Sequence, residues 1–313
     1  MKKYILLCAV LSVMMIITPL ISVEYTNDAL ASAMKESKKD DEYISVMMSA
    51  TGETSEMKMR EYVIGCVAGE MSADYHEEAL KAQAVASYTF AQYIKKRDKG
   101  KPGADISDDS SVYQSYIDES KRKEKWKDSF DKYESAVENA VDAVLGKCIL
   151  YDGEPIMAVY FDKCGGLTES SENIWGKKLP YLVSVTSDGD KLSPDLESIK
   201  ELTEDEFKNA FSKKEIDFSS DSKLIGEIER FDSGVVKKIT VSGCEVSGTE
   251  FRSLLELKSA DFSVENSDGK IMITCRGNGH FVGMSQYGAD YMARQGSNFK
   301  EILAHYYPNT EIS

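Results

Sequence analysis

The stretch MREYVIGCVAGEMSADYHEEALKAQAVASYTFAQYIKKRD, residues 59–98, decides the fold. Its first half repeats apolar side chains every three or four positions, which predicts a helix with one buried face. Asp74 followed by Glu77 has the pattern of a capping box, so a second helix is expected to start there. The apolar stripe of that second helix consists of Leu80, Ala84, Tyr88 and Ala91.

Glu70 continues the apolar face of the first predicted helix, one turn beyond Cys66 and Val67. A carboxylate on the apolar side of a helix end is expected to be partly desolvated, and desolvation raises its pKa. Such a glutamate can hold a proton near neutral pH and donate it to a leaving group. A solvated or capping role for Glu70 is the alternative that the residue pattern leaves open.

Length and charge bound the remaining possibilities. The 313 residues suffice for one large core or two modest ones. The chain carries 38 basic and 53 acidic residues, a net charge of −15, which argues against nucleic acid as a partner. The same charge argues against electrostatic binding to anionic lipid.

The N-terminus predicts where the protein works. Lys2 and Lys3 precede an uncharged run from Tyr4 to Val23 that is long enough to cross a bilayer. We expect residues 1–33 to be a retained single-span anchor or signal-like segment, with the rest of the chain outside the cytoplasm. Residues 34–56 are polar and are expected to be a flexible linker.

Beyond the helical pair, residues 105–111 are an acidic and hydroxyl-rich run, interpreted as a solvated surface loop. A third helix is expected over about 130–144, followed by a hairpin whose strands, 148–151 and 156–161, flank a turn at Asp152–Pro155. Paired glycines, Gly165 and Gly166, follow its second strand and allow a close backbone approach.

From about 186 to 265 the composition indicates a smaller inserted lobe. Thr203 and Glu206 form a capping box, and two hairpins are expected at residues 232–234 and 266–269. The fold class expected from these elements is α+β. It combines a mixed or antiparallel sheet core, a helical pair carrying the catalytic Glu and the inserted α+β lobe, all within residues 57–313 and after an N-terminal transmembrane helix.

The last strand leads into the loop GNGHFVGMSQYG, residues 277–288. It lacks the order and the lysine of a phosphate loop, so its glycines are expected to let the loop pack against a ligand. The hydrogen-bonding groups that it offers are His280, Ser285, Gln286 and Tyr287. Trp175 and Tyr181 are aromatic surfaces on which sugars could stack, or ordinary core residues.

The cysteines and histidines offer rival candidate sites. Five cysteines follow the apolar run, without metal-ligand spacing, and are expected to be scattered buried thiols. A thiol–imidazole pair of Cys164 and His280 would indicate a cysteine hydrolase if the two glycine-rich loops met. We predict no metal site and no cofactor.

Four segments together resemble the stage II sporulation protein D family, the peptidoglycan lytic transglycosylases of endospore-forming bacteria. The segments, in the family's order and spacing, are Val67–Met71, Glu78–Ala86, Gly165–Trp175 and Gly279–Ala289. The similarity runs from about residue 57 to the C-terminal 302–307 region. A single one of these motifs would be weak, whereas the ordered set is specific.

The resemblance implies an enzyme that cleaves glycan strands between N-acetylmuramic acid and N-acetylglucosamine, leaving 1,6-anhydro ends. Glu70 matches the family's catalytic acid/base. The substrate contacts are expected at Lys81, Gln83, Tyr88, Gly165, Gly166, Thr168, Glu172, Trp175, His280, Ser285, Gln286 and Tyr287. The family acts on peptide-free glycan with a partner amidase and a membrane protein of the engulfment complex, so septal thinning and engulfment at the mother-cell membrane are implied.

Departures from the family pattern bear on the site. Ser87-Tyr88-Thr89 stands where relatives usually have Arg-Thr, so a cationic contact to substrate is expected to be lost or moved. Residues 105–113 lack the two cysteines common in relatives, and Cys164 replaces a common serine. Two alternatives remain: a glycan-binding scaffold for the amidase, and a muramidase that uses water.

Overall fold

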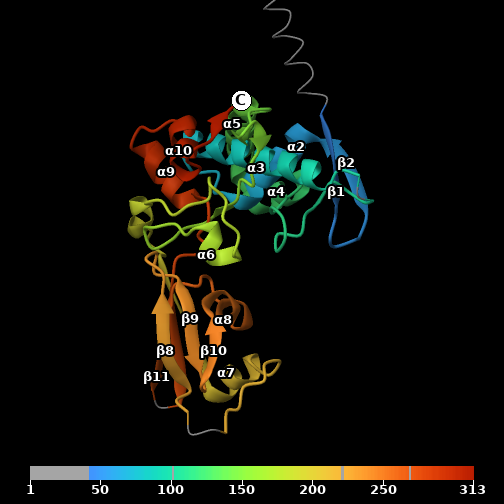
Figure 1. The fold of residues 1–313 in the computed structure, drawn as a ribbon. Coiled ribbons are helices and arrows are strands. Elements are labelled where there is room, and N and C mark those ends of the chain that lie inside the picture. The colour runs from blue at the N-terminus through green and yellow to red at the C-terminus, as the bar shows by residue number, and fades with distance from the viewer. Residues whose placement is uncertain (1–41, 101, 220–221, 268) are drawn as a thin grey trace, which may run out of the picture.

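In the computed structural model, which describes residues 42–100, 102–219, 222–267 and 269–313, the fold is a mixed α+β arrangement. Figure 1 shows a helical upper part and, below it, a β-rich part. We call residues 42–196 and 277–313 the helical body and residues 197–276 the β lobe. Each has its own cluster of buried apolar side chains.

The two helices predicted from the opening stretch form the centre of the helical body. They are α2 (Met59–Glu70) and α3 (Glu77–Arg97). Their apolar faces are buried against each other, as the spacing predicted. The predicted cap was wrong: His76 caps α3, and its Nδ1 accepts a hydrogen bond of 3.2 Å from the N–H of Glu78. Asp74 instead accepts a hydrogen bond from Tyr133, which draws its carboxylate away from the helix end.

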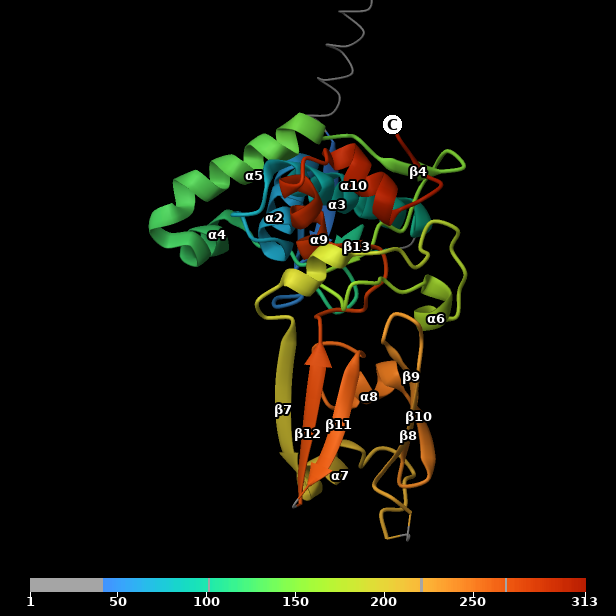
Figure 2. The same ribbon diagram turned by 90° about the vertical axis from the view of Figure 1, so that its left-hand side faces the viewer.

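A second helical layer packs on this pair (Figure 2). The third predicted helix is α5 (Phe130–Val144), whose apolar stripe, including Val137 and Val141, is buried against α3. It is preceded by α4 (Glu119–Trp126) and the short η1 (Lys127–Ser129). The C-terminal helices α9 (Gln286–Arg294) and α10 (Phe299–Tyr306) pack on α3 as well.

Short strands connect these helices. The expected linker contains two strands, β1 (Tyr43–Met47) and β2 (Thr54–Lys58), which pair antiparallel, so residues 43–47 and 54–58 are ordered. β1 also pairs with β3 (Ile106–Ser107). The remaining part of that expected linker, residues 34–41, lies outside the described residues, as does the anchor expected at residues 1–33.

The hairpin turn predicted around Asp152-Gly153 is confirmed, because β4 (Ile149–Tyr151) pairs with β5 (Glu154–Pro155) and both turn residues have positive φ. The second strand predicted at 156–161 was wrong, because the two-residue turn places its partner strand directly after Gly153. The next strand, β6 (Tyr160–Phe161), does not belong to that hairpin. It pairs parallel with β13 (Met284–Ser285) and so brings the two glycine-rich segments together. The remaining elements of the helical body are α6 (Ser171–Trp175), η2 (Asp188–Leu192) and β14 (Glu311–Ile312).

The β lobe contains two three-stranded antiparallel sheets, with strand orders β11-β12-β7 and β10-β9-β8. Their strands are β7 (Glu197–Thr203), β8 (Ile225–Arg230), β9 (Val236–Val241), β10 (Cys244–Ser247), β11 (Phe262–Ser267) and β12 (Lys270–Arg276). Both predicted hairpins and the Thr203–Glu206 capping box are confirmed. Two short helices, α7 (Glu204–Ala210) and α8 (Gly248–Leu254), supply Phe207 and Phe251 to the lobe's core.

Within the described ranges, no helix combines the length and the apolar composition that crossing a bilayer requires.

Candidate active site

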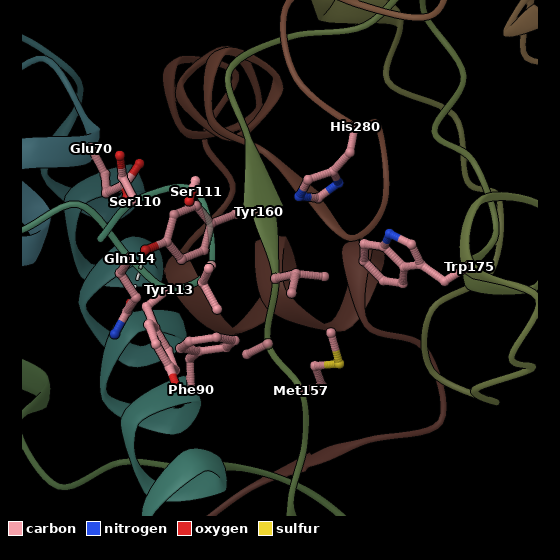
Figure 3. Close-up of a pocket in the computed structure, with 13 residues that line it drawn as sticks. Glu70, Phe90, Ser110, Ser111, Tyr113, Gln114, Met157, Tyr160, Trp175 and His280 are labelled. Carbon is pink, nitrogen blue, oxygen red and sulfur yellow. Dashed lines mark hydrogen bonds between the residues drawn. The ribbon is translucent and has the colours of Figure 1, made fainter. Parts of the chain in front are cut away.

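A cavity of about 410 Å³ opens beside the C-terminal end of α2 (Figure 3). We call it the Glu70 cavity. Its walls come from six separate parts of the chain: helix α2, helix α3, the 110–114 loop, the 157–160 segment, the end of α6 and the loop that contains His280. The lining residues are Glu70, Phe90, Ser110, Ser111, Val112, Tyr113, Gln114, Met157, Ala158, Val159, Tyr160, Trp175 and His280.

Glu70 is the last residue of α2, and it is partly buried. Burial raises the pKa of Glu70 to about 7, although hydrogen bonds from the Ser115 backbone and the Gln286 side chain, together with the charge of Lys125, act in the opposite direction. The N–H of Ser115 lies 2.5 Å from Oε1. A carboxyl group with this pKa is partly protonated at neutral pH, as an acid catalyst requires.

Two buried glutamines from distant parts of the sequence support Glu70. Gln286 hydrogen-bonds the carboxylate, and its Nε2 also donates to Oε1 of Gln83 at 3.2 Å. Gln83 in turn donates to the hydroxyl of Ser87 at 3.1 Å. Gln83 belongs to α3 and Gln286 begins α9, so packing between these helices sets the orientation of the carboxylate.

Tyr160 forms the middle of the cavity and was not predicted as a site residue. Its hydroxyl donates to Oε1 of Gln114 at 2.8 Å. Gln114 is itself fixed, because its Nε2 donates to the hydroxyl of Tyr62 and to the carbonyl of Ser87. These bonds hold the 110–114 loop against both helices of the pair, with Tyr160 facing the side of Glu70 (Figure 3).

Trp175 and His280 form the opposite wall, which we call the Trp175 wall (Figure 3). Their rings meet edge to face, with centroids 5.4 Å apart, and Trp175 remains 41% exposed. Nδ1 of His280 accepts a hydrogen bond from the N–H of Val282. Burial lowers the pKa of His280 to about 4, so this imidazole is neutral at pH 7. An exposed indole beside a neutral imidazole is a surface suited to a sugar ring.

The structure does not bring every predicted contact to the cavity. Lys81 forms ion pairs with Glu77 and Glu78 on its own helix. The hydroxyl of Tyr88 donates to Glu42 at 2.9 Å. Neither Lys81 nor Tyr88 belongs to the lining, because both lie on other faces of α3 than Phe90, which lines the cavity.

The predicted contacts near Gly165 and Gly166 also lie outside the lining. A side chain at Gly166, whose φ is +108°, would meet Lys191, and Gly165 lies close to Asp261. Thr168 is buried and accepts a hydrogen bond from the N–H of Val185. Glu172 is exposed in the first turn of α6. These residues shape the segment that leads to Trp175.

Ser285 and Tyr287 flank Gln286 without lining the cavity. Ser285 caps α9 and donates a hydrogen bond of 2.8 Å to the buried Asp190. The ring of Tyr287 lies under the ammonium group of Lys163.

The arrangement does not favour a cysteine hydrolase. The thiol of Cys164 donates to the carboxylate of Asp190 at 3.0 Å, while His280 accepts from a backbone N–H. Burial and the negative charge of Asp190 raise the pKa of Cys164, which keeps the thiol protonated. The five cysteines of the described part of the chain carry free thiols, and four of them are buried.

The sequence interpretation missed the 110–114 loop, Phe90, Met157 and Tyr160. The acidic and hydroxyl-rich run at 105–111 predicts a solvated surface loop, and Ser110, Ser111 and Val112 are indeed exposed. The available signal was Tyr113-Gln114, an aromatic and an amide at the end of the acidic run. Tyr160 carried no signal, because an aromatic residue in a strand is ordinarily a core residue.

The chain is similar to known sporulation proteins over most of its length. The family model described as Stage II sporulation protein matches residues 48–151, a range that contains Glu70 and the 110–114 loop. The chain is 32% identical to Stage II sporulation protein D of Bacillus subtilis over 333 residues, covering 100% of this chain and 96% of that protein. It is 34% identical to Stage II sporulation protein D of Bacillus amyloliquefaciens, covering 86% of this chain and 78% of that protein. A protein of Bacillus subtilis named Amidase enhancer is 27% identical over 80% of this chain and 40% of its own length.

Proposed function

The chain belongs to the stage II sporulation protein D family, a family involved in sporulation, and on that premise we propose that it is a lytic transglycosylase acting on peptidoglycan. The substrate would be peptide-free glycan, cleaved between N-acetylmuramic acid and N-acetylglucosamine. The observation that carries the proposal is the pKa of Glu70, raised to about 7 by burial at the end of the cavity.

Glu70 first acts as the acid. Its proton passes to the glycosidic oxygen while the bond between that oxygen and C1 of the muramic residue breaks. The carboxylate then takes the proton of the muramic 6-hydroxyl, and O6 forms the new bond to C1. The 1,6-anhydro ring closes, Glu70 is protonated again, and no water is consumed. The donors Ser115 and Gln286 would stabilise the carboxylate between the two steps.

The lining of the cavity supports a reaction with one carboxylate. Glycosidases that use water ordinarily need two carboxylates flanking the bond. Among the described residues that line the Glu70 cavity, Glu70 alone has a carboxyl side chain. The muramidase alternative would require a second one, and therefore ranks below the transglycosylase.

The other residues expected to bind substrate would take different roles. Trp175 and His280 would contact the sugar rings directly, and Gln83 and Gln286 would act through Glu70. The other expected substrate contacts lie outside the cavity lining, so any contact that they make with the glycan would lie beyond the Glu70 cavity: Lys81, Tyr88, Gly165, Gly166, Thr168, Glu172, Ser285 and Tyr287. No step of the proposed reaction uses a metal or cofactor.

We further propose that the protein is held at the membrane by its N-terminal segment and works outside the cytoplasm, in septal thinning and engulfment. A partner amidase would first strip the peptides from the glycan. The name of the similar Amidase enhancer supports a link to such an enzyme.

Product analysis tests the function. The full chain is incubated with peptide-free glycan strands, and the products are examined by mass spectrometry. Anhydro ends are expected. Reducing ends would identify the muramidase, and absence of cleavage with retained glycan binding would identify the scaffold.

A further inference from the structure

The β lobe contacts the helical body directly behind the Trp175 wall. The turn between β8 and β9, residues 231–235, reaches up into the body, near α6 (Figure 1). Val235 and Ala260 of the lobe are buried in one cluster with three residues of the body, Phe161, Cys164 and Phe281. Phe161 and Phe281 also pack on each other, and Phe161 packs on the ring of His280. The lobe therefore packs behind the loop that carries His280.

A buried carboxylate connects the two parts. Glu169 belongs to the helical body and is 2% exposed. Its Oε2 accepts a hydrogen bond of 2.6 Å from the hydroxyl of Ser233, in the β8–β9 turn of the lobe. Ser233 is buried as well, so water has little access to this bond. A hydrogen bond to a carboxylate is stronger in such a low-dielectric environment than in water.

The other carboxylate oxygen of Glu169 fixes α6. Oε1 accepts from the N–H of Ser170 at 2.7 Å and from the side-chain amide of Asn173 at 2.9 Å. Ser170 caps α6, and Trp175 is the last residue of that helix. With only five residues in α6, the contacts of its first turn decide where Trp175 lies.

The backbone of Glu169 holds the second residue of the wall. Its N–H donates to the carbonyl of Phe281 at 2.7 Å, next to His280. One residue thus binds the lobe, the helix that carries Trp175 and the loop that carries His280. A cavity of about 330 Å³ adjoins this junction, between residues 229–233 and 169–173, so apolar packing does not fill it.

We propose that Ser233 and Glu169 are positioning residues through which the β lobe holds the Trp175 wall in place for the glycan. The proposal rests on the proposed function and assigns a role to the lobe: it sets substrate affinity without contributing a reacting group. Loss of the Ser233 bond is expected to loosen α6 and weaken glycan binding. The ionisation of Glu70, on the opposite wall, is expected to stay unchanged.

The test measures binding separately from cleavage. The full chain with Glu70→Gln is titrated calorimetrically with peptide-free glycan strands, with and without Ser233→Ala. We expect Ser233→Ala to raise the Kd by about three- to tenfold. Ser263→Ala, at an exposed position of β11 in the same lobe, is the matched control and is expected to leave the Kd unchanged.

Tryptophan fluorescence gives a local readout. The chain has two tryptophans, so in a Trp126→Phe background all tryptophan emission comes from Trp175. Ser233→Ala is expected to change its emission before glycan is added. In a Trp175→Ala background, Ser233→Ala is expected to have no further effect on the Kd, because its effect passes through Trp175.

An unchanged Kd and emission in Ser233→Ala would overturn the proposal. So would an equal weakening in the Trp175→Ala background, which would indicate a general structural effect. Failure of the proposed function has a different signature: the unsubstituted chain would bind glycan but release no anhydro ends. Absence of glycan binding by the unsubstituted chain would overturn both.

Discussion

The hydroxyl of Tyr160 donates a hydrogen bond of 2.8 Å to Oε1 of Gln114, and this contact joins two walls of the Glu70 cavity. Tyr160→Phe removes that bond, together with the longer contact of 3.5 Å between the hydroxyls of Tyr160 and Ser87. We expect about a five- to tenfold lower kcat/KM, because one hydrogen bond contributes about 1 kcal/mol and the 110–114 loop loses an anchor. Kinetics on peptide-free glycan measure the change. Tyr133→Phe, which removes a surface bond to Asp74, is the control, and equal losses in both variants would contradict the role of Tyr160.

Glu70→Gln removes the titratable proton while keeping the size of the side chain. We expect cleavage to fall by at least about 10²-fold, the usual contribution of a general acid, with an unchanged circular dichroism spectrum. Glu61→Gln, on the exposed side of the same helix, is the control and should retain activity. Turnover at the wild-type rate by the Glu70→Gln protein would refute the assignment.

The pH dependence follows from the same residue. Glu70 must be protonated to act as an acid, and its pKa is raised to about 7, so cleavage should decline as the pH rises through about 7. A pH–rate profile of kcat/KM on isolated glycan measures this. If the residual activity of the Glu70→Gln protein still declined as the pH rose through about 7, a group other than Glu70 would be titrating.

The raised pKa also predicts a stability effect. The folded state binds the Glu70 proton more tightly than the unfolded chain, whose glutamate titrates near 4.5. The resulting stabilisation is complete below about pH 4.5 and disappears as the pH rises through about 7. Glu70→Gln, which has no charge to bury, should therefore gain about 1–3 kcal/mol relative to wild type between pH 5 and pH 8. Denaturant unfolding at both pH values measures the gain, and a constant difference would contradict the prediction.

His280 is expected to contribute to substrate binding through the shape of its ring and through a neutral imidazole. Its pKa is lowered to about 4 by burial, so its charge does not change between pH 5 and pH 8. His280→Ala should raise KM several-fold, by about 1 kcal/mol of lost contact, while leaving the midpoint of the pH profile in place. Thermal unfolding verifies that the variant is folded. Unchanged kinetics in His280→Ala would mean that the loop containing His280 has a structural role and does not contact the substrate.

Local patterns were reliable where neighbouring residues decide the structure. The three- and four-residue spacing around Val63 and Val67 predicted α2, and the Thr203–Glu206 pair predicted the start of α7. The cap at Asp74 failed because Tyr133, distant in the sequence, hydrogen-bonds its carboxylate and His76 takes its place. Propensity describes what a segment prefers, and a tertiary contact of about 1 kcal/mol is enough to shift a helix start.

The sequence by itself determined the helical pair, the apolar face from which Glu70 projects, and the family resemblance. Only the tertiary structure decided which groups meet that carboxylate: the N–H of Ser115 and the side chain of Gln286 reach it, whereas Lys81 and Tyr88 have other partners. The physical reason is that desolvation and hydrogen bonding depend on atoms brought together by packing. The parallel pairing of β6 with β13 carries these groups to one place, and no local periodicity encodes that register.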